Sequence, residues 1–289
     1  MKVLYILDGS AFLYRSFFAL PPLSTSKGFP TGAIYGFMRA VFSILKTESP
    51  KYFVVVFDHP SPTTREKIYK EYKSKRPTMP DSLKVQIPVI KNLLRLMGIS
   101  VIELEGYEAD DLIGYITERA LELGFHVRVY SPDKDVLQLV SERVIVINPI
   151  SKDVFDHKAV LEKFGVVPGL IPDYLALVGD KVDNVEGVKG IGKKTALRVL
   201  KEYGNVENIL RNWEDFSLHF PHADKEKLKL AYSLVKLHPV YGLKIELENL
   251  TMKRPDKDTL TNIFLELEVK SLIKDLEAIS RSTSQKELF

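Results

Sequence analysis

Four aspartates follow short hydrophobic runs, in a pattern that predicts a cluster of metal ligands. Asp8, Asp58 and Asp133 each end such a run, and Asp135 lies two residues after Asp133. The runs are rich in β-branched and aromatic residues, which is typical of buried strands in a parallel sheet. Because ligands bind at the carboxyl ends of such strands, we expect the four carboxylates to meet at one edge of the sheet. Their mutual repulsion would then require a counter-charge, for which divalent cations are suited.

Five further acidic residues form two more groups. Glu108, Asp110 and Asp111 fall where a helix is expected to begin, and their spacing places Glu108 and Asp111 on one face of it. Helix capping and the helix dipole would account for one or two acids there, whereas three acids beside the sheet edge favour metal binding. Asp180 and Asp183 form a D-x-x-D motif that a simple turn would explain equally well.

A glycine-rich segment follows Asp183 and predicts contact with phosphate. Residues 187–196 read GVKGIGKKTA, the pattern of a glycine hairpin that opens a helix and offers backbone N–H groups to phosphate. The segment nearly matches a nucleotide-binding P-loop, but Lys194 occupies the position of the metal-binding hydroxyl and no strand is expected before it. We therefore expect it to grip a DNA backbone without reading the base sequence.

Composition restricts the kind of metal and the kind of substrate. The 289 residues include no cysteine and six histidines, so a metal cluster must be mainly oxygen-ligated, which favours Mg²⁺ or Mn²⁺ over zinc. The net charge is +3, yet without the nine acids above, 41 basic residues face 29 acidic ones. A basic body around an acidic site suits a phosphate-containing substrate, although lysines that only contact solvent would give the same balance.

The sequence contains no pattern of a membrane span or a secretory signal. Its hydrophobic runs stay below the ~18 residues that a membrane span needs. The first of them is interrupted by Asp8, which a signal peptide would not tolerate. The simplest expectation is a cytoplasmic protein.

Strand and helix patterns alternate through the first part of the chain and predict a doubly wound, mainly parallel α/β sheet. Helices are expected at residues 33–47, at 81–97 and from Glu108, and further strands at 101–104 and 144–148. A polar, basic stretch occupies residues 64–77. From about Leu170 the pattern is mainly helical, with one more strand expected at 243–247. We place a domain boundary near Pro172 and expect a polar, flexible tail at 280–289.

Taken together, these motifs resemble those of flap endonuclease family 5′-nucleases, most of all the 5′→3′ exonuclease domain of bacterial DNA polymerase I. The resemblance covers about residues 1–275 and rests on six ordered motifs, LDG (7–9), AIYGF (33–37), VFD (56–58), GYEADD (106–111), GDKVDN (179–184) and GVKGIG (187–192), with Asp133 and Asp135 between them. It implies a PIN-like nuclease domain (1–172) with a helical arch (about 64–80), a helix-hairpin-helix-type DNA-binding module (173–279) and the tail (280–289).

The resemblance also implies roles for the acids. Asp8, Asp58, Glu108 and Asp110 match one metal site, with Asp111 adjacent. Asp133, Asp135, Asp180 and Asp183 match the second. Two or three Mg²⁺ ions, for which Mn²⁺ can substitute, would then support in-line hydrolysis of a phosphodiester, leaving a 5′-phosphate and a 3′-hydroxyl.

Basic and aromatic residues complete the site that the resemblance implies. Lys73 and Arg76 in the arch would meet the scissile phosphate as catalytic residues, with Arg15 nearby, although the arch sequence alone would suit a solvated basic helix. Tyr72 would stack on a base, and Lys70 and Lys75 would contact DNA. In the hairpin, the duplex-binding residues would be Gly187, Lys189, Gly190, Gly192, Lys193 and Lys194, and backbone carbonyls there would hold K⁺.

The sequence therefore predicts a structure-specific 5′-nuclease, both a 5′→3′ exonuclease and a flap endonuclease, that removes DNA flaps and RNA primers in replication and repair. Its partners would be branched or nicked duplex DNA with a 5′ flap and RNA-primed DNA, bound by a monomer at the bacterial nucleoid. Two alternatives stay open: an inactive DNA-junction binding protein with vestigial metal ligands, and an RNA-directed PIN-type nuclease. The ending favours a separate polypeptide over a fragment of a polymerase.

The last five residues form a separate motif. Gln285, Leu288 and Phe289 match the Q-x-x-L-F form of peptides that bind the bacterial sliding clamp. In such peptides Leu and Phe fill an apolar pocket while Gln makes directional hydrogen bonds, and the polar residues 280–284 would serve as a tether. A frayed terminus is the alternative.

Overall fold

The computed structural model describes residues 2–149 and 151–286, with side chains described as far as residue 279. A six-stranded sheet lies at its centre, in the order β3-β2-β1-β4-β5-β6. The strands are β1 (Val3–Asp8), β2 (Tyr52–Val56), β3 (Ser100–Ile102), β4 (His126–Tyr130), β5 (Val144–Ile147) and β6 (Val154–Phe155). The first five run parallel, and β6 runs antiparallel to β5. The expected doubly wound, mainly parallel sheet is confirmed.

The register of the sheet brings the first group of acids to one edge. β1 pairs with β2 so that Asp8 lies opposite Val56, and with β4 so that Leu7 lies opposite Tyr130. The three central strands therefore end at the same level, and the chain runs on from two of them into Asp58 and Asp133. The carboxyl edge of the sheet is thus the place where these acids are delivered.

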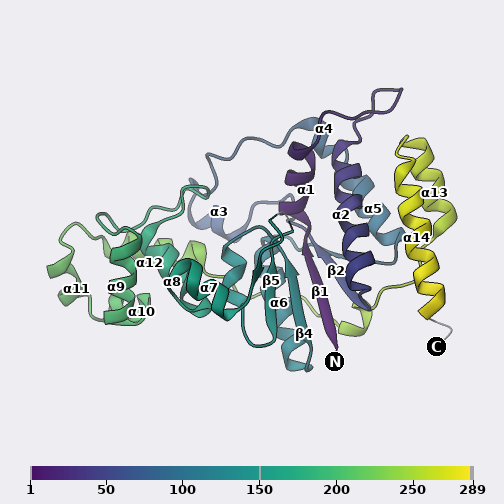
Figure 1. Cartoon of the computed structure of the whole chain (residues 1–289). Coiled ribbons are helices and arrows are strands. Elements are labelled where there is room, and N and C mark those ends of the chain that lie inside the picture. The colour runs from purple at the N-terminus through teal and green to yellow at the C-terminus, as the bar shows by residue number, and fades with distance from the viewer. Residues whose placement is uncertain (1, 150, 287–289) are drawn as a thin grey trace.

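Helices cover both faces of the sheet (Figure 1). They include α1 (Gly9–Ala19), α2 (Gly32–Glu48), α5 (Ile87–Leu96), α6 (Ala109–Glu122), α7 (His157–Phe164) and α8 (Ile171–Val178). Tyr5 and Leu7 of β1 belong to the core formed with α1, α2 and α5, whereas Leu4 and Ile6 belong to the core formed with α6 and α8. Because successive side chains of a strand point to opposite faces, β1 serves both cores.

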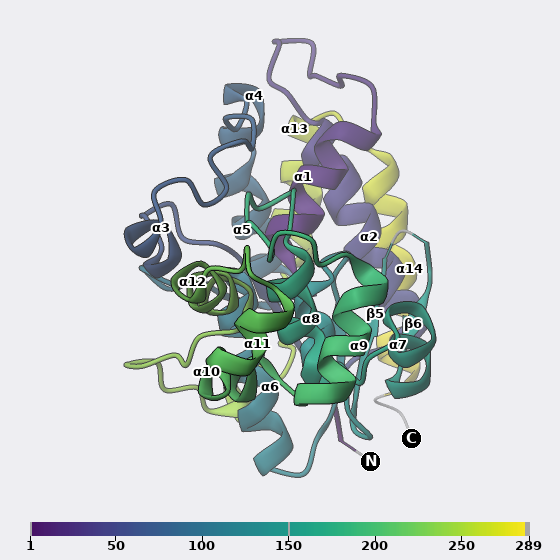
Figure 2. The same ribbon diagram turned by 90° about the vertical axis from the view of Figure 1, so that its left-hand side faces the viewer.

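A helical module projects from one side of the sheet domain (Figure 1) and is seen from its outer side in Figure 2. It comprises α8, α9 (Lys193–Tyr203), α10 (Val206–Arg211), α11 (Trp213–His219) and α12 (Lys225–Val235). The module shares a continuous buried core with the sheet through residues such as Leu175 and Leu234. The change from alternating elements to helices, expected near Leu170, is confirmed.

After this module the chain returns to the opposite side of the sheet domain, where α13 (Lys257–Glu266) and α14 (Ser271–Lys286) lie beside α2 and α5 (Figure 1). The buried carboxylate of Asp275 in α14 accepts hydrogen bonds from Arg39 (2.7 Å) and Lys46 (2.6 Å) of α2. α14 continues to Lys286, so residues 280–286 of the expected flexible tail are helical. Leu288 and Phe289 lie outside the described residues.

The arch, residues 64–80, begins with the short helix α3 (Thr64–Ile68) and continues through turns to α4 (Asp81–Lys84). A single helix expected at 81–97 is divided into α4 and α5 (Ile87–Leu96). Pro88 accounts for the start of α5, because proline lacks an N–H donor and fits the first turn of a helix.

The prediction of a strand at 243–247 is wrong. The chain there forms no ladder, and the 3₁₀ helix η3 (Leu247–Leu250) begins at its end. Leu243 and Ile245 pack partly against the core and Leu247 is buried. The alternation of apolar residues therefore reflects packing against the core, and it does not reflect strand pairing.

Within the described ranges, none of the helices is long and apolar enough to cross a membrane.

Candidate active site

Asp8 occupies the end of β1 and is almost fully buried, with 2% of its surface exposed. Its carboxylate accepts hydrogen bonds from the Ala11 N–H (3.0 Å), as the N-cap of α1, and from the Ser131 hydroxyl (2.7 Å). Asp58, which follows β2, accepts one from the Ala109 N–H at the start of α6 (2.7 Å). These bonds join the ends of β1 and β2 to the helix that carries the second group of acids.

The charges in this cluster are only partly balanced. Burial raises the pKa of Asp8 to about 7, and the nearby charges of Asp58 and Asp133 add to the rise. Burial likewise raises the pKa of Asp110 well above its ordinary value, and again Asp133 contributes. Carboxylates placed in this way favour a bound cation, which would let them all ionise.

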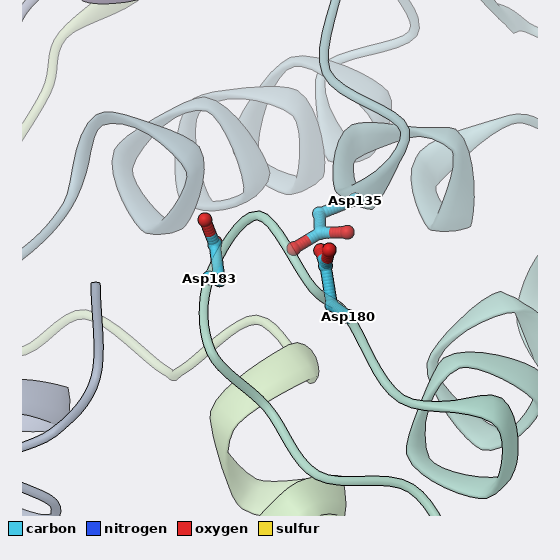
Figure 3. Close-up of side chains that lie close together, drawn as sticks. All are labelled: Asp135, Asp180 and Asp183. Atoms are coloured by element: carbon cyan, nitrogen blue, oxygen red, sulfur yellow. The ribbon is translucent and has the colours of Figure 1, made fainter. Parts of the chain in front are cut away.

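The third group of acids joins the same edge. Asp135 opens the 3₁₀ helix η1 (Asp135–Leu139), and Asp180 and Asp183 lie in the loop after α8. Each offers a carboxylate oxygen, and these oxygens lie within 4.8 Å of one another. Figure 3 shows the three side chains on the segments that carry them. We call these residues the loop triad. Burial and the charge of Asp133 raise the pKa of Asp135 well above its ordinary value. The carboxylate of Asp135 therefore interacts with Asp133 as well as with Asp180 and Asp183.

The loop triad fits a hard divalent cation. Within the described part of the chain, Asp135 Oδ1 is buried and accepts no hydrogen bond, and the Lys134 ammonium lies 4.0 Å from it, beyond hydrogen-bond distance. A buried carboxylate oxygen without a donor is costly unless a cation occupies the space in front of it. The donor set of the triad consists of oxygen alone, which suits Mg²⁺ or Mn²⁺.

Two glycines allow the loop triad to form. Gly179, at φ +80°, and Gly187 approach so closely that a Cβ on Gly187 would lie 2.4 Å from the carbonyl carbon of Val178. Between them, Asp180 and Val185 exchange two backbone hydrogen bonds, of 2.9 and 2.8 Å. The loop is thereby closed with Asp180 and Asp183 both inside it.

The arch brings basic side chains onto the acids. Lys73 Nζ lies 2.9 Å from Glu108 Oε2, and Arg76 forms an ion pair with Asp183. Lys134, which lies between Asp133 and Asp135, pairs with Asp180. The structure therefore places Lys73 beside Glu108 and Arg76 beside Asp183.

Tyr72 does not lie where base stacking would need it. It is buried, with 4% of its surface exposed, and its hydroxyl contacts Glu108 Oε2 (3.3 Å) and Asp183 Oδ2 (3.4 Å). Its ring packs in the core beside the sheet. In this structure Tyr72 is a support beneath the acids, and its ring is covered from a nucleic-acid base.

Asp111 is also placed differently from the metal-ligand expectation. Both its oxygens accept from the guanidinium of Arg65, at 2.7 and 2.8 Å, and one also accepts from the His238 N–H at 2.8 Å. The carboxylate is thus already compensated, and it faces a cation of the chain itself. That Asp111 binds metal stays a prediction, and the partner that the structure shows for it is Arg65.

Arg65 is the residue that sequence reasoning missed. It belongs to α3 and is 3% exposed, and besides Asp111 it contacts Glu108 and donates to the carbonyls of Leu234 and Lys236 at the end of α12. One guanidinium therefore joins the arch, the start of α6 and the helical module. In the sequence Arg65 is one base among many in a basic stretch, so only burial distinguishes it.

The remaining predicted bases are exposed, and the hairpin glycines are exposed or half-buried. Arg15 is exposed on α1, the helix that begins directly after Asp8, and Lys70 and Lys75 are exposed in the arch. Gly187, Gly190 and Gly192 lie in the turns before α9, with Gly190 at φ +86° and Gly192 as the N-cap of α9. The exposed lysines of this segment are Lys189, Lys193 and Lys194.

Two family models match the chain in succession. Residues 3–165 match the 5′-3′ exonuclease, N-terminal resolvase-like domain, and residues 166–258 match the 5′-3′ exonuclease, C-terminal SAM fold. The two matches meet close to the boundary expected at residue 172, and α14 lies beyond the second of them.

Similar proteins carry the same description. A 5′-3′ exonuclease of Aquifex aeolicus is 61% identical over 289 residues, which is the full length of both chains. A DNA polymerase I of Caldicellulosiruptor bescii is 40% identical over 282 residues, and there the match takes up 94% of this chain but 33% of the polymerase. The chain thus spans about a third of the polymerase relative.

Solved structures show the same fold. The bacteriophage T5 flap endonuclease, in a pseudo-enzyme-product complex with DNA and metal ions, superimposes with a TM-score of 0.67 at 21% identity, covering 96% of this chain and all of the phage chain. With both family models, a full-length relative and this likeness in fold in agreement, the chain belongs to the 5′-3′ exonuclease family and is homologous to the exonuclease domain of DNA polymerase I.

Proposed function

We propose that this chain is a metal-dependent, structure-specific 5′-nuclease that acts as a monomer on branched or nicked duplex DNA with a 5′ flap and on RNA-primed DNA. The observation that carries the proposal is the meeting of Lys73 and Arg76 from the arch with Glu108 and Asp183 at the carboxyl edge of the sheet. Acids that bind cations and bases that bind phosphate are thereby within one small region.

The ligands of the cations would come from both groups. Asp8, Asp58, Glu108 and Asp110 would hold one site, and Asp133, Asp135, Asp180 and Asp183 the other. Two or three Mg²⁺ ions, or Mn²⁺ in their place, would coordinate the Asp135 oxygen that accepts no hydrogen bond. They would also stabilise the ionised forms of Asp8, Asp110 and Asp135, whose pKa values are raised without a cation. The chemistry that divalent cations supply in such a site is activation of water and stabilisation of the attacking and leaving oxygens.

Lys73 and Arg76 would act on the substrate. While they neutralise Glu108 and Asp183, their charges occupy the place that a cation would take. Once cations balance the acids, both side chains are free to turn to the scissile phosphate and stabilise the charge that grows on it, with Arg15 adding positive charge from α1. Lys70 and Lys75 would hold the 5′ strand.

The test is cleavage of a labelled 5′-flap duplex with and without Mg²⁺. We expect cleavage with Mg²⁺ that stops with a chelator and a product that ends in a 5′-phosphate. Binding without cleavage would favour the inactive DNA-junction protein, and preference for single-stranded RNA without a junction would favour the RNA-directed nuclease. Either outcome would contradict the proposal.

The glycine hairpin would hold the duplex away from the cut, with K⁺ bound through its backbone carbonyls. We expect the double variant Lys193→Ala with Lys194→Ala to weaken duplex binding equally for unrelated sequences, because phosphate contacts carry no sequence information. The slope of log K against log salt should fall by up to about 2, since each phosphate contact contributes about 0.9. Affinity measured at several salt concentrations checks this.

The matched control removes two exposed lysines elsewhere. Lys270 directly precedes α14 and Lys274 lies in its first turn, on the opposite side of the sheet domain (Figure 1). Changing both to Ala removes the same charge, and we expect the salt slope to stay unchanged. A loss of affinity confined to particular base sequences in the hairpin variant would contradict the non-specific grip.

The tail would recruit the bacterial sliding clamp through Gln285, Leu288 and Phe289. α14 runs toward the end of the molecule where β1 starts, which is opposite the edge that carries the acids (Figure 1). A clamp bound there would leave the candidate active site open.

We also propose that the protein works in the bacterial cytoplasm, at the nucleoid, where such substrates arise.

Deletion of residues 285–289 should abolish clamp binding and leave flap cleavage in the absence of clamp unchanged. The anchor of α14 is retained, because Asp275, Leu276 and Ile279 precede the deletion and are buried. Titration of clamp against full-length and shortened protein measures the first effect. Equal clamp affinity of the two proteins would rule out the motif.

A further inference from the structure

Two segments that are far apart in the sequence are joined by two hydrogen bonds, one between their backbones and one from a side chain. The Lys73 N–H of the arch donates to the Asp183 carbonyl (3.0 Å), and the Asn184 side-chain amide donates back to the Glu71 carbonyl (2.9 Å). The first segment carries the basic side chains and the second carries the loop triad. The pair of bonds therefore fixes bases and acids relative to each other.

Both segments adopt an unusual backbone conformation at the point where they meet. Lys73 has φ +55° and Asn184 has φ +56°, in the left-handed region that costs most residues about 1 kcal/mol. Asparagine tolerates this region better than other non-glycine residues, whereas lysine has no such advantage. The local cost at Lys73 persists because the surrounding bonds require that conformation.

We propose that Asn184 is a positioning residue, which clasps the turn at residues 71–73 to the loop that carries Asp180 and Asp183. The proposal deepens the proposed nuclease function and rests on it. The Lys73 side chain leaves the clasped backbone toward Glu108, and Arg76 leaves the next turn, closed by its N–H to the Lys73 carbonyl (2.9 Å), toward Asp183. The clasp thus sets where both bases stand when a phosphate reaches the loop triad.

Asn184 does not itself need to touch a phosphate or a cation for this role. Its amide is committed to the Glu71 carbonyl, which also accepts from the Ser74 N–H (3.1 Å) and the Ser74 hydroxyl (2.7 Å). The neighbouring Asp183 contributes its carbonyl to the clasp and its carboxylate to the triad. A change at Asn184 is therefore transmitted to the site by loosening the arch.

The variant Asn184→Gly isolates the side-chain bond. Glycine adopts φ +56° without strain, so the backbone conformation is kept and only the amide donor is lost. The matched control is Lys152→Gly, because Lys152 has φ +63° and lies exposed in the β5–β6 turn. Both variants exchange one left-handed residue for glycine, and only one of them touches the clasp.

Amide hydrogen exchange tests the clasp without metal or DNA. We expect the Lys73 N–H to be protected in the unaltered protein and in Lys152→Gly, and to exchange about tenfold faster in Asn184→Gly, as when a local structural bond is removed. An unprotected Lys73 N–H in the unaltered protein, or equal rates in all three proteins, would overturn the proposal whether or not the protein cleaves DNA.

The consequence for catalysis is measured in single-turnover cleavage of a 5′-flap duplex. We expect Asn184→Gly to lower the cleavage rate about tenfold and to leave the dissociation constant for DNA within about twofold, since positioning acts on the chemical step. In a background with both Lys73→Ala and Arg76→Ala the same substitution should add less than about a twofold loss, because its effect passes through these two bases. Independent, multiplicative losses would contradict a positioning role and favour a general loss of stability.

Discussion

Replacing Asp135 by Asn should lower flap cleavage by about a thousandfold or more, which corresponds to about 4 kcal/mol of transition-state stabilisation. The physical reason is that Asp135 supplies a buried carboxylate oxygen that accepts no hydrogen bond within the described residues and lies beside Asp180 and Asp183. An amide is a much weaker ligand for a hard cation. Single-turnover cleavage with saturating Mg²⁺ measures the loss, and duplex affinity should change little.

The stability of the same variant should move the other way. In the metal-free protein, burial and the charges of Asp133, Asp183 and Asp180 disfavour the ionised form of Asp135 and raise its pKa, although Lys134 acts against them. Replacing it by a neutral amide should therefore leave the melting temperature in a chelator unchanged or higher. Asp153, exposed in the β5–β6 turn, gives the control: Asp153→Asn should alter neither cleavage nor melting. Full cleavage activity of Asp135→Asn would contradict the proposal that the loop triad binds metal.

For Asp111→Asn we expect the opposite result, a loss of stability without a change in the Mg²⁺ requirement. The comparison with Asp135→Asn distinguishes a metal ligand from an acid that stabilises the fold. Removing this charge leaves the buried Arg65 without its bidentate partner, a change that typically costs about 3–5 kcal/mol of stability. We therefore expect a lower melting temperature at every Mg²⁺ concentration, with the Mg²⁺ requirement of the remaining activity unchanged. A large shift in that requirement would restore Asp111 to the metal site.

The contrast between Asp110 and Asp111 shows what the sequence could and could not predict. The strands, the edge at which they end, and the gathering of three groups of acids were predictable, because buried strands and their last residues are recognisable in a linear pattern. Which of two adjacent acids faces the cluster depends on the rotation of α6 and on Arg65. That partner is 46 residues away in the sequence.

Tyr72 and Arg65 illustrate the same limit for the arch. A basic segment with two tyrosines is typical of an exposed helix. Its pattern does not predict that Arg65 and Tyr72 are buried while Lys70 and Lys75 are exposed. The packing arises because α12 and the loop triad close over this segment, which is a contact between distant parts of the chain. The short strand β6 was missed for a similar reason, since a two-residue edge strand is defined by its partner.

The metal-free protein should lose stability as the pH rises, and Asp8 should account for a large part of that loss. Its pKa is raised in the folded state from an ordinary value of 3.8 to about 7, mainly by burial. Between these two values the unfolded chain releases a proton that the folded protein keeps, so the free energy of unfolding falls with rising pH. From pH 5 to pH 8 the contribution of Asp8 is about 3 kcal/mol, at about 1.36 kcal/mol for each pH unit below the folded pKa.

The variant Asp8→Asn isolates this contribution. Asparagine can still accept from the Ala11 N–H as the N-cap of α1, so the helix start is preserved while the titrating group is removed. We expect urea unfolding in a chelator to show a fall in stability from pH 5 to pH 8 that is about 3 kcal/mol smaller in the variant than in the unaltered protein. With saturating Mg²⁺ the unaltered protein should regain stability at pH 8, because the cation binds the ionised form. An identical pH dependence of the two proteins without metal would show that Asp8 is already ionised in the fold, and the charge argument for a cation at the end of β1 would fail.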